Sequence, residues 1–236
     1  MKQLSIILLG LLVLTFTACE KVRGEGPIVT EHRNVSDFSG IDLRSEADLY
    51  YRAGPDYSVV VSGQQNVLDV LETYTSEGKL VIRYRGDVRV RSHDRLHIQV
   101  TAPAVNRLKV RGSGEIMTSG PLNPSRLDMD VDGSGGIRVS ELTANHLDAE
   151  VIGSGSVRVA GGTATEVETL VSGSGDIDLA EVQASEATTV TSGSGDTRLR
   201  VTSRLKSTIS GSGNVYYRGS PTIETHISGS GRVVKL

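Results

Sequence analysis

The stretch LDMDVDGSGGIRV, residues 127–139, decides the fold because it carries two patterns at once. Apolar and polar residues alternate on both sides of a Gly-Ser-Gly triplet, which is typical of strands with one buried face. The layout returns in LDAEVIGSGSVRV at 147–159, in VETLVSGSGDIDL at 167–179 and in LKSTISGSGNVYY at 205–217. Counted from the first glycine of each triplet, apolar or small residues recur at positions −6, −4, −2, +4 and +6. These repeats predict strands that stack coil upon coil.

The spacing of the triplets sets the length of each coil. Successive triplets begin 21, 20, 20, 20, 18 and 18 residues apart, and such a period indicates a solenoid. Strands in neighbouring coils would lie about 4.8 Å apart, so that equivalent residues form ladders. We therefore predict an all-β fold, a parallel β-solenoid with about 20 residues per coil.

The glycines of the triplets are interpreted as architecture. If the period-2 alternation continues through each triplet, both glycines face inward and the serine faces outward. Paired inward glycines leave the wall without side chains, so the chain can bend sharply or another wall can approach closely. These structural glycines are Gly112, Gly114, Gly133, Gly135, Gly153, Gly155, Gly173, Gly175, Gly193, Gly195, Gly211, Gly213, Gly229 and Gly231.

The serines of the triplets would form a ladder of hydroxyls on the surface, in which each hydroxyl can donate to one neighbour and accept from another. Such a row could bind a sugar, or it could be a corner that tolerates small polar residues, and both interpretations stay open. The ladder consists of Ser113, Ser134, Ser154, Ser174, Ser194, Ser212 and Ser230.

Position +3, directly after each triplet, brings two carboxylates into neighbouring coils. Asp176 and Asp196 would stack, with Asn214 in the following coil. Two carboxylates roughly 5 Å apart repel each other unless something compensates. Ion pairs with the arginines at position +5 are a sufficient explanation. A calcium ion held by Asp176, Asp196 and Asn214 is the sharper hypothesis, because hard oxygen ligands suit calcium.

The N-terminus has the features of an export signal. One lysine precedes an apolar run from Leu4 to Val13, and small and hydroxylated residues lead to Cys19, the only cysteine. The run is shorter than the roughly 20 residues of a membrane span, so residues 1–18 are interpreted as a signal peptide. The stretch Leu14–Cys19 resembles a bacterial lipobox, whose cysteine is acylated. A buried cysteine or an intermolecular disulfide is the alternative.

The rest of the chain divides into three parts. Residues 19–27 are charged and glycine-rich and would form a short tether. Residues 28–105 contain short β-type runs broken by turn residues, and Gln64–Leu71 has the apolar spacing of one or two helical turns. We expect irregular β coils in this region, continuous with a regular solenoid over 106–236.

The composition gives little support for nucleic-acid binding or catalysis. The net charge is −3, and the chain has no tryptophan and two phenylalanines, so few rings could stack on sugars. β-Helix enzymes that act on polysaccharides need convergent carboxylates in a groove. The outward acids are spread over neighbouring coils, which favours a solvated face; they are Asp128, Asp130, Asp132, Asp148, Glu150 and Glu168.

Three stretches before the regular repeats, together with the later triplets, carry a family resemblance. They are VSDFSGIDLRSEADLYYRAG at 35–54, SVVVSGQQNVLDVLETYTSEGKLVIRYR at 58–85 and RLHIQVTAPAVNRLKVRGSGEI at 95–116. On these, the chain from Val35 to Leu236 resembles a bacterial family of exported autotransporter adhesins with a head GIN domain, many of which are lipoproteins. The resemblance implies a right-handed parallel β-helix and an adhesin-like role, and it supplies no catalytic residue.

We therefore predict a non-enzymatic lipoprotein of the cell envelope, without a cofactor, that acts as an adhesin-like or structural binding module. Acylation of Cys19, for example with palmitate, would anchor it to the outer membrane, on the periplasmic or the surface face. A glycan or an envelope protein is the expected partner, and a carbohydrate-active lyase or hydrolase is the alternative. No polar cap follows the last triplet, so a second subunit or the N-terminal segment is expected to cover residues 223–234.

Overall fold

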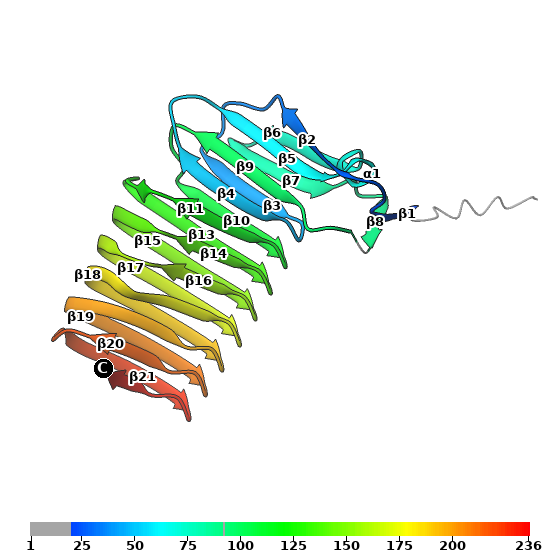
Figure 1. Ribbon diagram of the computed structural model, residues 1–236. Coiled ribbons are helices and arrows are strands. Elements are labelled where there is room, and N and C mark those ends of the chain that lie inside the picture. Colours follow the sequence, from blue (N-terminus) through cyan, green and yellow to red (C-terminus); the bar gives the residue numbers. More distant parts are fainter. Residues whose placement is uncertain (1–19, 92) are drawn as a thin grey trace, which may run out of the picture.

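The computed structural model describes residues 20–91 and 93–236, and it is built almost entirely of β-strands (Figure 1). From Arg107 onward the strands of each coil pair in parallel with those of the coils before and after. Gly133 pairs with Gly153 and Gly153 pairs with Gly173, so these coils are 20 residues apart. The chain is a parallel β-solenoid, as the repeats predicted.

Each triplet separates two walls of the solenoid. The strands that lead into a triplet are β10 (Arg107–Gly112), β13 (Arg126–Gly133), β15 (Glu141–Gly153), β17 (Gly162–Gly173), β18 (Asp176–Gly193), β19 (Thr197–Gly211) and β21 (Thr222–Gly229). The strands that follow one are β11 (Glu115–Ser119), β14 (Gly136–Val139), β16 (Ser156–Val159), β20 (Val215–Arg218) and β22 (Val233–Lys235), together with the first residues of β18 and β19. A short strand, β12 (Pro121–Leu122), pairs with the start of β15.

The inward positions of the repeat form the core. In the coil of residues 127–139, the five side chains at these positions are at most 1% exposed; they are Leu127, Met129, Val131, Ile137 and Val139. Later coils place hydroxyl residues at position −4, and Thr189 donates a hydrogen bond to Ser207 at 2.9 Å inside the core. Burial of stacked aliphatic ladders is the main force that holds the coils together.

The N-terminal region does not stack in the order of the sequence. β3 (Gly40–Arg44) and β4 (Asp48–Ala53) form a coil that pairs with β10 and β11 on one side. On its other side this coil pairs with β7 (Lys79–Tyr84) and β9 (His97–Ala102). The segment 79–102 therefore lies outside the segment 40–53, although it comes later in the chain. The pairing makes the N-terminal region continuous with the regular solenoid.

Antiparallel strands close this end. β5 (Ser58–Gln64) pairs with β9 and with β2 (Ile28–Arg33), and β6 (Leu71–Ser76) pairs with β7. The helical turn expected in this region is α1 (Gln65–Leu68). Two of the bulkiest fully buried side chains, Tyr51 and Phe38, belong to this region.

The predicted tether is partly a strand. β1 (Glu20–Arg23) pairs in parallel with β8 (Val88–Arg91). The Asn66 side chain accepts a hydrogen bond from the Glu25 amide at 3.1 Å and donates one to the Arg23 carbonyl. Residues 20–25 are therefore attached to the body of the protein. The predicted signal peptide and Cys19 lie outside the described residues. Within residues 20–91 and 93–236, no helix is long and apolar enough to span a membrane.

The last coil presents inward positions to solvent. Every residue of β21 is exposed, including Ile223 at 40% and Ile227 at 42%. β1 lies at the other end of the stack (Figure 1), so the N-terminal segment from residue 20 onward does not cover this coil. Coverage by a second subunit stays a prediction.

Candidate functional site

The triplets are turns in which the two glycines have different tasks. Each first glycine ends a strand with a positive φ, such as 114° at Gly153. A Cβ there would also lie 2.5 Å from the carbonyl oxygen of Gly133. The second glycine, Gly155, is buried, and a Cβ on it would lie 2.4 Å from the carbonyl oxygen of Gly135. Burial still alternates through the triplet 153–155, where Gly153 is half-buried, Ser154 is exposed and Gly155 is buried. The second glycine therefore faces fully inward, and the first does so only in part, because it forms the turn.

The backbone of the triplets is satisfied from coil to coil. The carbonyl oxygen of Gly133 accepts hydrogen bonds from the amides of Ser154 and Gly155, both at 2.9 Å. The same pair of bonds links each triplet from the second to the seventh to the triplet before it. Their amides are used within the fold, so they do not form a ligand cradle.

The seven triplet serines are all exposed, in the outward orientation that the sequence predicted. Within the described part of the chain, no hydrogen bond joins one of these hydroxyls to another. The ladder therefore offers hydroxyls to solvent without a network of its own. Sugar binding by this ladder stays a prediction.

The predicted calcium ligands do lie in neighbouring coils, and they bond to the protein. Asp176 Oδ1 accepts a hydrogen bond from the Asp196 amide at 2.8 Å. Asp196 Oδ1 accepts two from Asn214, at 3.0 Å from the backbone amide and 3.1 Å from the side chain. Arg198 contacts the other oxygen of Asp196 at 3.6 Å. These contacts account for the carboxylates without an ion, and calcium binding stays a prediction.

The wall before the triplets carries a second, larger set of charges. A groove of about 580 Å³ runs across several coils of this wall, and we call it the axial groove. It is lined by Lys79, Arg107, Lys109, Arg111, Arg126, Asp128, Asp130, Asp148, Ala149, Glu150, Glu168, Thr169, Leu170, Thr188 and Val190. Its outward side chains are those at positions −5, −3 and −1, where equivalent residues stack in register.

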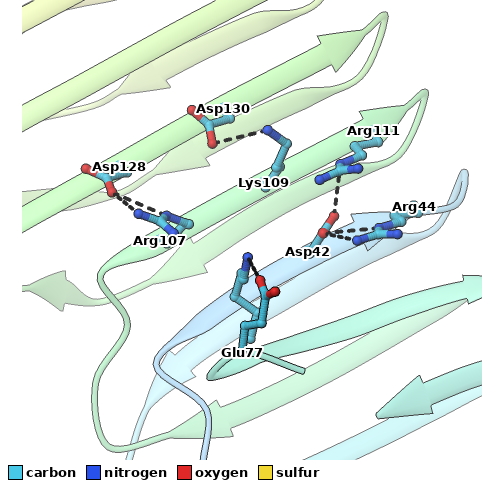
Figure 2. A network of polar contacts seen from close by, with 9 residues as sticks. Asp42, Arg44, Glu77, Arg107, Lys109, Arg111, Asp128 and Asp130 are labelled. Atoms are coloured by element: carbon cyan, nitrogen blue, oxygen red, sulfur yellow. Dashed lines mark hydrogen bonds and ion pairs between the residues drawn. The ribbon is translucent and has the colours of Figure 1, made fainter. Parts of the chain in front are cut away.

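Ion pairs link the first coils of the axial groove to one another, as Figure 2 shows. Arg107 Nη2 lies 2.8 Å from Asp128 Oδ2, and Lys109 Nζ lies 3.4 Å from Asp130 Oδ2. Arg111 points to the buried carboxylate of Asp42, with 3.5 Å between Nε and Oδ1. The first coils therefore neutralise the acids that follow them.

Arg126 connects two acids of the axial groove, since it contacts both Asp128 and Asp148. Partial burial alone would raise the pKa of Asp128, but hydrogen bonds from Arg107 and Arg126 outweigh this and lower the pKa below its ordinary value. Burial raises the pKa of Asp148 to about 6; Arg126 opposes that shift, whereas Glu168 and Asp128 add to it. Two neighbouring carboxylates thus have pKa values shifted in opposite directions.

The axial groove changes in character along the solenoid. Cations dominate its first coils, carboxylates follow from Asp128 to Glu168, and Leu170 and Val190 line its last part. An extended ligand with charged and apolar parts would match this order. The acids were expected on this face, but the groove was not. The cations could have been found by counting, because Arg107 and Asp128 both occupy position −5.

Another cluster lies near the N-terminal end. His93 Nε2 contacts Glu46 Oε1, and the Tyr84 hydroxyl donates to the same oxygen at 3.0 Å. Burial, with the nearby Glu46 carboxylate, raises the pKa of Tyr84 well above its usual range. In the described residues, no group of three or more histidine, cysteine or acidic side chains could hold a metal ion. The cluster therefore holds His93 against Glu46 and Tyr84.

The stacked coils, glycine turns and open charged faces define the chain as a parallel β-solenoid with charged walls. It belongs to the family described as "Putative auto-transporter adhesin, head GIN domain", whose profile matches residues 37–221. A comparison with curated proteins finds no match.

Solved structures with the same fold come from Bacteroides and Parabacteroides species. A putative adhesin from Bacteroides fragilis is 23% identical, with a TM-score of 0.85 over 91% of this chain and 100% of that one. A putative lipid binding protein from Parabacteroides distasonis is 23% identical, with a TM-score of 0.77 over 92% and 100%. A putative adhesin from Parabacteroides merdae is 20% identical, with a TM-score of 0.75 over 92% and 99%. At these identities the likeness concerns the fold alone.

Proposed function

We propose that the protein is a non-enzymatic, lipid-anchored adhesin-like module of the cell envelope, which binds a glycan or an envelope protein in the axial groove. The single observation that carries this proposal is the groove itself, which combines charged ladders with an apolar end across several coils. Family membership and the adhesin names of similar structures agree with it. Acylation of Cys19 would supply the anchor.

The ion pairing of the groove supports binding rather than hydrolysis. Asp128, Asp130 and Asp148 each contact a cation of the same or a neighbouring coil. These contacts occupy carboxylate oxygens that a general acid or a nucleophile would present to a bound sugar. Paired ladders on an open sheet face instead form a patterned surface, which a partner of complementary charge can match.

The alternative function is that of a carbohydrate-active enzyme, and one pair of residues favours it. Asp128 and Asp148 are register neighbours on adjacent strands. Adjacent strands lie about 4.8 Å apart, which is close to the roughly 5 Å between the two carboxyl groups of retaining glycosidases. Their pKa values are shifted in opposite directions, as an acid and a nucleophile require. Arg126, which contacts both, argues against free carboxylates at this place.

The experiment is to incubate the full chain with a panel of envelope and host glycans and to record both retention and glycan mass. Retention with unchanged mass is the expected result. Cleaved or unsaturated products that disappear in an Asp148→Asn variant would overturn the proposal in favour of the enzyme. The absence of both retention and products would contradict glycan binding, and capture of envelope proteins on the same column would then identify the other partner class.

A matched pair of variants tests whether the axial groove is the binding face. Arg107→Gln with Arg126→Gln removes two cations of the groove. Arg138→Gln with Arg158→Gln removes two exposed arginines of the wall after the triplets. We expect the first pair to reduce retention about ten-fold, as the loss of contacts to a charged ligand would, and the second to leave it unchanged. The reverse order would assign binding to the other wall.

A further inference from the structure

A small basic surface lies at the N-terminal edge of the fold, where β1 pairs with β8. Lys21 lies opposite Arg89, and Arg23 lies opposite Arg91. All four side chains are exposed on the same face of this two-stranded sheet. We call them the basic ribbon.

The other face of the ribbon is held against the protein. Val22 is buried in the core, and Val88 and Val90 pack against it. The Asn66 side chain, on α1, bonds the chain directly after β1. The cations of the ribbon therefore point in one fixed direction rather than moving as part of a free tail.

The four cations of the ribbon have no acidic partner in the described residues. The axial groove is different, because Arg107, Lys109 and Arg126 all contact carboxylates of adjoining coils. Like charges directly opposite each other on neighbouring strands destabilise a sheet. An external anionic surface would offset the repulsion within the two pairs and would be bound by all four cations together.

The position of the ribbon indicates which surface this is. β1 begins at Glu20, one residue after Cys19, and one residue spans at most about 3.6 Å. An acyl chain on Cys19 would hold the ribbon at the bilayer surface, where acyl chains and basic side chains together give stable attachment. We propose that the basic ribbon binds the anionic phospholipid headgroups of the membrane in which the protein is anchored. This inference rests on the lipid anchor of the proposed function.

The ribbon would also orient the protein. In Figure 1 β1 and β8 lie beside α1 at the N-terminal end, and the regular coils extend away from them. Contact of the ribbon with the headgroups leaves the axial groove and the last coil free of the membrane. An acyl chain alone would allow the solenoid to tilt in any direction.

The test measures how fast an amine-reactive acetylating reagent labels Lys21 in the full chain. The protein is purified from membranes and reconstituted into vesicles of phosphatidylcholine alone or with one quarter phosphatidylglycerol. Lys206, which is exposed on β19 in the later coils of the solenoid, is the internal reference. We expect Lys21 to react about three-fold or more slowly on the anionic vesicles, with protection lost at about 0.5 M salt, while Lys206 is unchanged.

Two triple variants test whether the protection of Lys21 depends on where the cations lie or only on how many there are. Arg23→Gln, Arg89→Gln and Arg91→Gln together should abolish the protection of Lys21. Arg200→Gln, Arg204→Gln and Arg232→Gln remove three exposed arginines of the later coils, and they should leave it intact. Equal labelling on neutral and anionic vesicles, or equal effects of both triple variants, would overturn the inference.

The mass of the N-terminal peptide distinguishes this inference from the anchor on which it rests. An acylated Cys19 with an unprotected Lys21 would leave the anchor in place and contradict headgroup binding. If Cys19 is not acylated, the anchor proposal is wrong, and the same labelling with excess anionic vesicles in solution decides on the ribbon. Protection by added dextran sulfate but not by anionic lipid would show that the partner is an acidic polysaccharide, and the inference would be wrong.

Discussion

The first corner of the solenoid differs from all the later ones in having no glycine. Register places Ser45, Glu46 and Ala47 at the level of the triplet 112–114 in the next coil. Ala47 is fully buried, and it stands where the triplets have their second glycine. On its outer side, β7 and β9 are joined by the long segment 85–96, so no tight corner lies against it. In later coils a Cβ would collide with the carbonyl of the preceding triplet.

This difference shows why the glycines repeat. A bend alone can be made by Ser-Glu-Ala, as the first corner demonstrates. Glycine is needed where one tight corner stacks directly on another, because backbone then approaches backbone. Side-chain size follows the same division: bulky Phe38 and Tyr51 fill the N-terminal end, whereas threonine and serine enter the core of the later coils.

The largest effect is expected from a methyl group in a stacked corner. In Gly155→Ala the new Cβ would lie 2.4 Å from the carbonyl oxygen of Gly135 and 2.5 Å from Val131 Cγ1. The coils must separate locally, and we expect the free energy of unfolding to fall by about 3 kcal/mol in chemical denaturation.

Gly161→Ala is the matched control for this change, because nothing lies within 4 Å of a Cβ at Gly161. Its effect should stay within about 0.5 kcal/mol, as for other surface substitutions. Similar losses in the two variants would mean that stacking of corners does not explain the glycines.

A smaller loss is expected from the buried hydroxyl pair of the later coils. Thr189→Val removes the donor to Ser207 and leaves that serine without this partner in a core where both residues are at most 1% exposed. Unfolding free energy should fall by about 1–2 kcal/mol. Adding Ser207→Ala should recover much of the loss, and a double variant as unstable as the sum of the two single ones would contradict the pairing.

A buried side-chain hydrogen bond at the N-terminal end should contribute less to the free energy of unfolding. Tyr51 donates a buried hydrogen bond to the carbonyl oxygen of Ala102 at 3.0 Å, but the same oxygen also accepts from the Gly54 amide at 3.1 Å. Tyr51→Phe therefore leaves the acceptor satisfied, and we expect a loss of about 0.5–1 kcal/mol in thermal or chemical unfolding. A loss larger than that of Thr189→Val would reverse this ranking of the two ends.

The regular half of the fold could be predicted because its information is local. The triplet period gave the coil length, and period-2 alternation identified buried residues such as Leu127 and Val139. The stacking order of the N-terminal strands, which differs from their order in the sequence, could not be predicted in this way. Strands 40–53 lie between 79–102 and the regular coils, and such pairing depends on which sheet edges stay free, not on patterns within a strand.

The candidate site was predicted in part, because some of its residues occupy fixed positions in the local repeat. Counting from the triplets placed Asp128 and Asp148 on one outward face, and Asp176 beside Asp196, as the structure has them. The axial groove is lined by residues of several coils, and no single repeat encodes its hollow shape. The β1–β8 pairing joins segments almost 70 residues apart, and neither segment signals its partner.

The smallest expected effect is on the pH dependence of stability. It compares Asp148 with Asp128, which stack in neighbouring coils. The pKa of Asp148 in the folded protein is about 6, against an ordinary value of 3.8. The folded state therefore binds this proton more tightly than the unfolded state, and the resulting stability is lost as pH rises from 3.8 to about 6. Asp148→Asn should thus stabilise the protein near neutral pH, by a few tenths of a kcal/mol because the side chain is partly exposed and screened by solvent.

Asp128→Asn provides the control of opposite sign. The pKa of Asp128 is lowered in the folded protein, so its carboxylate adds stability above its ordinary pKa that is lost on acidification. Melting temperatures near pH 7 should therefore rise for Asp148→Asn and fall for Asp128→Asn. The difference for Asp148→Asn should shrink as pH falls from about 6 towards 3.8, whereas that for Asp128→Asn should shrink only below pH 3.8. Changes of the same sign would mean that the pKa values of the two acids are not shifted in opposite directions, and the enzyme alternative for the axial groove would lose the asymmetry on which it rests.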